Sequence, residues 1–189
     1  AISGIQSSNY TISAWIKKTG IGATTNEIFN QDYDGNHEIR LELSPTTCNA
    51  TFSTYEAGYG TITGTTNVCD GNWHYVTAVK IGTTGYVYVD GVQQNSGTVK
   101  NVVSTDRASI GALRDTTRVL YNFNGTIDEV AVWNRSLSAT DVSLLYNMSK
   151  DFPTSAWSNV TKVVNSTVGS TIRWCVYAND SSNNWNGSS

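Results

Sequence analysis

Apolar and polar residues alternate along most of this chain in short segments. Near the N-terminus, Ile12, Ala14 and Ile16 stand at every second position, with Thr, Ser and Trp between them. A two-residue period places alternate side chains on opposite faces of a β-strand. Turn signals such as Asp90-Gly91 separate the segments, which is typical of a β-sandwich or barrel. The same period marks residues 37–44, 49–55, 73–81, 85–90, 92–95, 108–113 and 123–133.

One helix is predicted after these segments. Ser138 can cap its N-terminus, and Asp141 stands at the third helical position, which is the spacing of a capping box. We expect a short surface helix that packs its apolar stripe on a sheet edge. The stripe consists of Val142, Leu144, Leu145 and Met148.

Charged residues are scarce in this chain. They make up 14% of it, against roughly 25% in an average soluble domain, and the net charge is −3. A chain with no basic field is not expected to bind nucleic acid. No apolar run approaches the ~20 residues that cross a bilayer, so no membrane span is predicted.

Nine Asn-x-Ser/Thr triplets occur, about twice the number that chance predicts from 19 Asn and 46 Ser or Thr in 189 residues. An Asn- and Thr-rich chain forms such triplets freely, but the excess favours a glycosylated extracellular or cell-surface protein. The acceptor residues are Asn9, Asn49, Asn124, Asn134, Asn147, Asn159, Asn165, Asn179 and Asn186.

Two of the three cysteines can form a local disulfide. Cys48 and Cys69 would close a loop of about 20 residues, a bridge worth roughly 3 kcal/mol outside the cell. Their flanking residues are polar and turn-like, which fits a surface staple better than a metal site. Cys175 is left without a local partner.

The composition changes after Lys150, where Asp151-Phe152-Pro153 is typical of a linker. Two more strands are predicted, at 160–164 and 171–177. Two or three strands cannot bury a core of their own. We therefore divide the chain into a first domain, 1–150, and a partial β segment, 151–189.

Five segments in order carry a family resemblance: YTISAWIK at 10–17, DGNWHYV at 70–76, YVYVDG at 86–91, FNGTIDEVAVW at 123–133 and NRSLS at 134–138. Together they resemble the laminin-G-like, concanavalin A-like jelly-roll family over about residues 5–148. The resemblance implies an all-β, antiparallel jelly-roll sandwich with one short C-terminal helix. It also implies an opening strand upstream of Ala1 or from another chain.

The tail is similar to short immunoglobulin-like repeats of very large archaeal surface proteins. The resemblance rests on residues 157–161, 171–180 and 184–187. It implies a partial immunoglobulin-like segment, an archaeal source and a longer modular protein. Because such repeats carry a cysteine beyond the Trp-Asn-Gly segment, Cys175 is expected to pair with a cysteine after Ser189 or with a neighbouring molecule.

The residues Glu38-Ile39-Arg40-Leu41-Glu42 place three charges on one face of a strand. Laminarinase-like glycosidases of the same fold use Glu-x-Asp-x-Glu for hydrolysis there. Arg40 replaces the middle Asp, and a cation between two carboxylates is expected to lower the pKa of both. We therefore predict an exposed, ion-paired strand face and no enzyme activity.

Two oxygen-rich places are candidates for calcium, a possible structural cofactor. The family resemblance implies that Asp128 helps to hold calcium, although it can equally cap a turn or accept backbone N–H groups. Asp32, Asp34 and Asn36 offer oxygens at alternate positions of a Gly-containing loop, which can also be a plain turn. They lack the downstream glutamate of an EF-hand, since Leu43 occupies its place.

Histidines and tryptophans give no further site. His37 and His74 are too few for zinc, and His74 is predicted to be a packed, hydrogen-bonded side chain. Trp15, Trp73 and Trp133 lie in predicted strands and are assigned to the core. No Ser/His/Asp set or P-loop occurs in the sequence.

Two functions remain open. In the first, the chain is a non-catalytic adhesion module that binds a glycan or a surface protein through rim loops. In the second, it is a structural unit of a surface layer or filament, completed by strand addition from neighbouring copies. A laminarinase-like hydrolase is a remote third. The predicted rim residues are Tyr33, Tyr55, Tyr59, Arg114, Asp115 and Arg118.

Overall fold

A computed structural model describes residues 5, 8–22, 26–31, 37–102, 108–114, 119–150, 176–179 and 185–188, with the backbone alone for 114, 119 and the last two segments. The chain separates into two compact units, Ala1–Phe152 and Pro153–Ser189. In the second unit, strands β13 (Val176–Asn179) and β14 (Trp185–Ser188) pair as an antiparallel hairpin. The remaining elements belong to the first unit.

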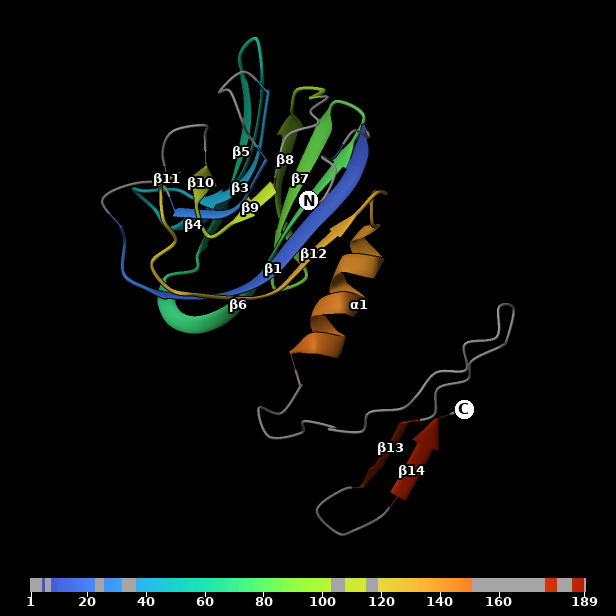
Figure 1. Ribbon diagram of the computed structural model, residues 1–189. Coiled ribbons are helices and arrows are strands. Elements are labelled where there is room, and N and C mark those ends of the chain that lie inside the picture. The colour runs from blue at the N-terminus through green and yellow to red at the C-terminus, as the bar shows by residue number, and fades with distance from the viewer. Residues whose placement is uncertain are drawn as a thin grey trace, which may run out of the picture. The chain divides into compact units, whose positions relative to one another are not determined.

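The first unit contains two antiparallel sheets of five strands each, whose strands are labelled in Figure 1. The first sheet has the order β12-β1-β6-β7-β8, and the second has the order β5-β4-β3-β2-β9. The predicted jelly-roll sandwich with one short helix is therefore confirmed. The first sheet comprises β1 (Asn9–Thr19), β6 (Asp70–Ile81), β7 (Thr84–Val89), β8 (Val92–Thr98) and β12 (Thr126–Trp133). The second comprises β2 (Asn26–Gln31), β3 (His37–Leu43), β4 (Asn49–Glu56), β5 (Tyr59–Asn67) and β9 (Ala108–Ile110), and a small separate hairpin comprises β10 (Leu113–Arg114) and β11 (Val119–Leu120).

The core lies between the two sheets, where the alternation predicted it. Ile12, Ala14 and Ile16 of β1 are fully buried, and Ile39 and Leu41 face them from the second sheet. Burying apolar side chains on both inner faces is the main force that holds a sandwich together. The sheet registers are fixed by this pattern, because a shift of one residue would turn every core side chain outward.

Glycines allow two close approaches in this packing. A Cβ on Gly85 of β7 would lie 2.7 Å from Ile62 Cδ1 and 3.0 Å from Phe52 Cδ1, both on the second sheet. A Cβ on Gly125 would lie 2.5 Å from the carbonyl oxygen of Lys17. The glycine in the FNG segment therefore lets the chain enter β12 alongside β1.

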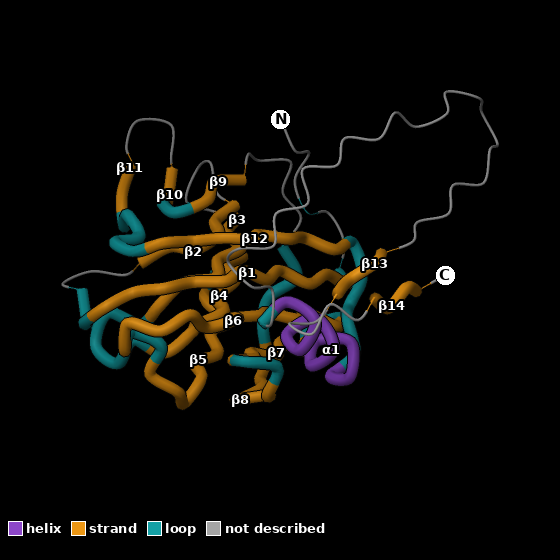
Figure 2. Tube along the Cα trace, turned by 90° about the horizontal axis from the view of Figure 1, so that it is seen from below, coloured by secondary structure: helices purple, strands orange, loops and turns teal. Residues whose placement is uncertain are grey.

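Helix α1 (Ala139–Ser149) packs on the outer face of the first sheet, beside β1 and β6 in Figure 2. The predicted capping box between Ser138 and Asp141 is present. The indole N–H of Trp15 on β1 donates to Ser149 Oγ at 3.0 Å, and its ring lies 5.8 Å from that of Tyr146. The helix thus covers a face of the first sheet. Our expectation that it would pack on a sheet edge was wrong.

The predicted apolar stripe of the helix is only partly buried. Val142 is fully buried, but Leu144 and Met148 are 55% and 64% exposed. The tryptophan prediction also needs correction: Trp73 is 40% exposed, and Trp133 packs under the helix outside the main core. A two-residue period assigns a side chain to a face but does not tell which face is covered.

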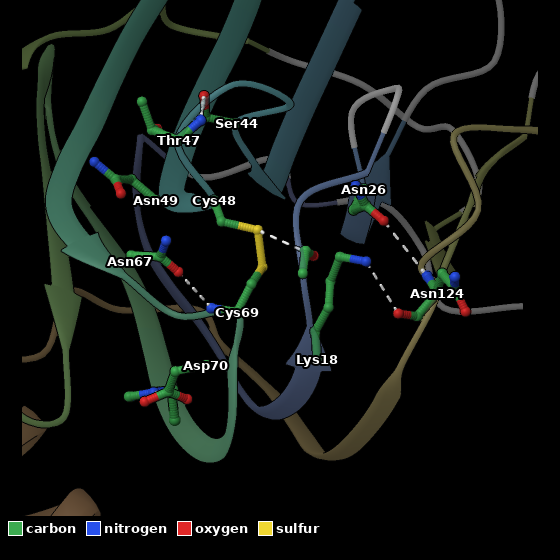
Figure 3. Close-up of a disulfide and its surroundings, with 12 residues drawn as sticks. Lys18, Asn26, Ser44, Thr47, Cys48, Asn49, Asn67, Cys69, Asp70 and Asn124 are labelled. Atoms are coloured by element: carbon green, nitrogen blue, oxygen red, sulfur yellow. Dashed lines mark hydrogen bonds and ion pairs between the residues drawn. A yellow bond between two sulfur atoms is a disulfide. The ribbon is translucent and has the colours of Figure 1, made fainter.

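The predicted disulfide joins Cys48 and Cys69, whose Cα atoms are 5.8 Å apart (Figure 3). It ties the turn before β4 to the turn before β6. Both cysteines are buried in the main core, so the bridge is not the surface staple that their polar flanks suggested. Nearby, Asn67 Oδ1 accepts from Cys69 N at 2.8 Å, and Asn49 donates to the carbonyl of Gly64 at 2.8 Å.

His74 is a packed, hydrogen-bonded side chain, as predicted. Its Nδ1 lies 2.8 Å from Asp90 Oδ2 in the β7–β8 turn, and its Nε2 lies 3.1 Å from Asp70 Oδ1. Asp90 also accepts from Tyr75 N at 2.9 Å. The hydrogen bond to Asp90 raises the pKa of His74, which favours the imidazolium that clamps the two aspartates. His74 therefore helps to fix the β7–β8 hairpin.

Candidate functional site

The outer side of the second sheet carries rows of polar side chains. Because Ile39, Leu41 and Leu43 of β3 enter the core, Glu38, Arg40 and Glu42 point outward. Residues that pair directly across antiparallel strands share a face, so the register extends these rows over β2, β4 and β5. We call the result the polar face: Glu27, Asn30, Glu38, Arg40, Glu42, Thr51, Ser53, Tyr55 and Tyr59.

Arg40 lies at the centre of the polar face. Its Nη2 is 2.6 Å from Glu38 Oε2, and its Nη1 is 3.7 Å from Glu27 Oε1. The predicted ion pairing on this strand is therefore present, with a closer partner in Glu38 than in Glu27. Asn30 stands directly opposite Arg40 across the strands, and both polar atoms of its amide are buried without a hydrogen-bond partner among the described residues.

The three carboxylates of the polar face are buried, which corrects our expectation of an exposed strand face. Glu27 is 0% exposed, Glu38 is 4% and Glu42 is 8%. Charged groups are rarely buried to this extent in proteins unless they are paired. An ion-paired face that only kept the protein soluble would not need such burial.

Burial reverses the pKa shift that we predicted for Glu42 on β3, and it also raises the pKa of Glu27 on the neighbouring strand β2. Desolvation raises the pKa of Glu27 to about 9, with a further increase from the charge of Glu42 and a smaller decrease from Arg40. The pKa of Glu42 is likewise raised, because the cost of burying its charge exceeds the lowering by Arg40. The sequence showed the neighbouring cation but not the desolvation.

An aromatic pair marks the accessible end of the polar face. The rings of Tyr55 and Tyr59 are 4.7 Å apart between centroids, and Tyr59 is 57% exposed. The Tyr59 hydroxyl donates to Glu38 Oε2 at 3.1 Å. The structure therefore joins two of the predicted rim residues to the charged strand.

The other predicted rim and loop residues lie outside the described part of the chain. Tyr33, Asp115 and Arg118 are among them, and so is the candidate calcium loop with Asp32, Asp34 and Asn36. Arg114 is described only as backbone in β10, paired with Val119. Cys175 is also outside the described residues.

Asp128, the other calcium candidate, lies exposed on β12. Its Oδ1 accepts from the backbone N–H of Glu129 at 2.8 Å. Among the residues that the structure describes, no group of three His, Cys, Asp or Glu side chains is arranged to hold a metal ion. Calcium at Asp128 stays a prediction that needs backbone oxygens or water as further ligands.

The predicted glycosylation acceptors differ in their environments. Asn9, Asn124, Asn134 and Asn147 are exposed. Asn49 is half-buried and holds the hydrogen bond to Gly64 near the disulfide. The side chains of the four acceptors in the second unit are outside the described part: Asn159, Asn165, Asn179 and Asn186.

Two residues of the polar face were not found from the sequence. Glu27 and Asn30 lie on β2, which the alternation did not reveal, because all six residues of this strand are buried and a bulge interrupts its register between Glu27 and Phe29. A mixed polar and apolar hexapeptide that is buried on both faces leaves no two-residue period. Within the described residues, no helix is long and apolar enough to cross a membrane.

Residues 2–143 match the family model of the concanavalin A-like lectin/glucanase superfamily. No curated protein matches the chain. Among solved structures, domain 4 of AbnA, an extracellular arabinanase from Geobacillus stearothermophilus in complex with arabinotriose, is 23% identical, with a TM-score of 0.62 over 75% of this chain and 68% of that one. The carbohydrate-binding module CBM40 of the Ruminococcus gnavus IT-sialidase is 14% identical, with a TM-score of 0.63 over 75% and 85%. A pentraxin from Limulus polyphemus is 18% identical, with a TM-score of 0.58 over 74% and 70%. At these identities, the similarity establishes the fold alone.

Proposed function

Because this chain belongs to the concanavalin A-like lectin/glucanase superfamily, we propose that its first unit is a non-catalytic module that binds glycans at the Tyr55–Tyr59 end of the polar face. The observation that carries the proposal is the exposed Tyr59 ring, which packs at a tilt against Tyr55 and whose hydroxyl donates to Glu38. Binding sites for small ligands commonly combine aromatic surface with a few fixed polar groups. Two of the similar structures described above are a carbohydrate-binding module and a domain with a bound trisaccharide, which supports this ligand class.

The roles of the side chains follow from their positions. The Tyr59 ring offers an apolar face for the C–H surface of a sugar ring, and its hydroxyl is oriented by Glu38. Arg40, whose side chain is 13% exposed, holds Glu38 in place through their 2.6 Å contact. A site whose groups are positioned in advance loses little conformational entropy when a ligand binds.

Hydrolysis is disfavoured by geometry and not by pKa. A raised pKa of Glu42 is the direction that a general acid needs, so the positive charge of Arg40 does not by itself disfavour hydrolysis. Two facts remain: the guanidinium of Arg40 contacts Glu38 directly, and Glu38 and Glu42 are only 4% and 8% exposed. A scissile bond must reach between both carboxyl groups of a glycosidase, so the burial of Glu38 and Glu42 supports a non-catalytic role.

We further propose that the protein acts outside the cell, as part of a modular surface protein. A buried disulfide is typical of oxidising compartments, and the exposed sequons agree with this location. The second unit would then be the adjoining immunoglobulin-like segment, and surface glycans or glycoproteins would be the partners.

A glycan array probed with the full chain tests the proposal. We expect binding to a limited set of glycans. Binding should be lost in Tyr59→Ala and kept in Trp73→Ala, which is the control because Trp73 is an exposed aromatic residue on the other sheet. A parallel assay for reducing sugar should show no hydrolysis of the glycans that bind. Equal binding by wild type and Tyr59→Ala would place the ligand elsewhere and refute the assigned site.

A further inference from the structure

Glu27 and Glu42 form a pair of buried carboxyl groups beneath the proposed site. They stand directly opposite each other on β2 and β3. Ser53 Oγ donates to Glu42 Oε1 at 3.0 Å, but no N–H or O–H group within the described chain reaches Glu42 Oε2 or either oxygen of Glu27. The strand register places the two carboxyl groups side by side, and the charge of Glu42 contributes to the raised pKa of Glu27.

Such a contact requires a proton. Two ionised carboxylates have only acceptors to offer and repel each other, and at this burial the repulsion is weakly screened. One proton turns the pair into a carboxylic acid that donates to a carboxylate, which satisfies both buried groups. The charge of Arg40 does not replace this proton. The short contact of Arg40 is to Glu38, and its Nη1 lies 3.7 Å from Glu27 Oε1.

We propose that Glu27 and Glu42 share one proton, and that release of this proton draws Arg40 from Glu38 toward Glu27 and so repositions Tyr59. The second half of the proposal rests on the proposed function, since it makes Tyr59 the reporter of the ligand site. The first half concerns the carboxyl pair alone.

The step is a simple ionisation with its charges balanced. The proton leaves to solvent, and the pair changes from one negative charge to two. The guanidinium of Arg40, already within 3.7 Å of Glu27 Oε1, is then attracted more strongly to Glu27. Glu38 loses part of its ion pair, and the Tyr59 hydroxyl that donates to Glu38 moves with it.

Glu27 lies on β2 and Glu42 on β3. The other titratable and charged groups of this cluster among the described residues are Glu38 and Arg40 on β3 and Tyr59 on β5. Burial, followed by the charge of Glu38, raises the pKa of Tyr59 above its ordinary value. The carboxyl pair, with the pKa of Glu27 at about 9, therefore titrates before the phenol does.

The test is an NMR titration of the full chain labelled with ¹³C at glutamate side-chain carboxyls, followed from acid to alkaline pH. Glu27→Gln and Glu42→Gln assign the signals, and both side chains are close to the originals in shape. We expect wild type to show a carboxyl titration in the alkaline range that disappears in either variant. The Tyr59 ring signals should shift with the same midpoint in wild type and not in Glu27→Gln. Glu56→Gln, a control at a half-exposed position of the same sheet, should leave both titrations in place.

Different results separate the two proposals. If both Glu27 and Glu42 ionise in the acid range, the shared proton is refuted, whether or not glycans bind. If the pair titrates in the alkaline range but the Tyr59 signals do not follow, the Arg40 coupling is refuted. If a glycan ligand is found, the affinity of the wild type for it should fall by about tenfold or more above the midpoint of the carboxyl titration, and the affinity of Glu27→Gln should not. Equal losses of affinity in both proteins would also refute the Arg40 coupling. Failure of every glycan to bind would refute the proposed function and leave the carboxyl titration intact as a test.

Discussion

Replacing Glu27 by Gln is expected to stabilise the protein at neutral pH, although the residue is fully buried. The glutamate keeps its proton in the folded state up to a pKa of about 9, against 4.5 for the ordinary group. As pH rises above 4.5, the unfolded chain releases this proton and the folded chain does not. The stability contribution of Glu27 is therefore complete below pH 4.5 and is lost progressively as pH rises toward 9.

The magnitude follows from the size of that window. Each pKa unit corresponds to about 1.4 kcal/mol, so the 2.5 units between pH 4.5 and pH 7 cost the wild type about 3 kcal/mol. Glutamine cannot ionise, and its amide can donate to Glu42 in place of the shared proton. The Glu27→Gln protein should equal the wild type near pH 4 and exceed it by about 3 kcal/mol at pH 7.

Urea unfolding of the two proteins at a series of pH values between 4 and 8 measures the difference. Glu56→Gln is the matched control, because Glu56 lies on the same sheet, its side chain is half-exposed, and its Oε2 is 3.6 Å from His37 Nε2. Its curve should run parallel to that of the wild type. Parallel curves for wild type and Glu27→Gln across the same range would show that Glu27 is ionised in the folded protein, and the reasoning about the carboxyl pair would fail.

Three further predictions test the fold and the metal site. Replacing Cys48 and Cys69 together by Ser should lower the free energy of unfolding by about 3 kcal/mol, and a melting temperature that reductant leaves unchanged would contradict this. Gly85→Ala should lower the free energy of unfolding by about 1–3 kcal/mol, since its Cβ would lie 2.7 Å from a core side chain. Gly97→Ala, whose Cβ has its nearest contact at 3.4 Å, should lower it less. The reverse order in thermal unfolding would contradict the close packing at Gly85. Calcium bound through Asp128 should raise the melting temperature, by about 2.7 kcal/mol of stabilisation at a hundredfold excess over Kd. EDTA and Asp128→Asn should both abolish that increase, and no effect of either would mean that calcium does not bind there.

The sandwich itself was predictable because its strands follow a simple rule. Segments such as β1 and β3 alternate apolar core side chains with residues on the opposite face that are mostly polar, so the two-residue period is visible in the sequence. Asp90 and Gly91 stand at the hairpin turn with positive φ angles of 52° and 76°, as their residue types predicted. Local chemistry determines these features, so a single sequence reveals them.

The candidate site was only half visible in the sequence, for physical reasons. The spacing of Glu38, Arg40 and Glu42 gave the shared face, but not its burial, and burial determined the direction of the pKa shifts. Glu27 lies 15 positions before Glu42 and meets it only through the pairing of β2 with β3. Contacts across strands depend on register, and here a bulge shifts the register of the strand that carries Glu27.

Titration calorimetry with the best glycan from the array tests the central claim most directly. Wild type, Tyr59→Ala and Trp73→Ala should be compared at neutral pH with the same glycan. We expect Tyr59→Ala to weaken binding by about tenfold or more, which corresponds to at least about 1.4 kcal/mol, and Trp73→Ala to bind like the wild type. Unchanged affinity in Tyr59→Ala, or an equal loss in Trp73→Ala, would contradict a glycan site at this end of the polar face.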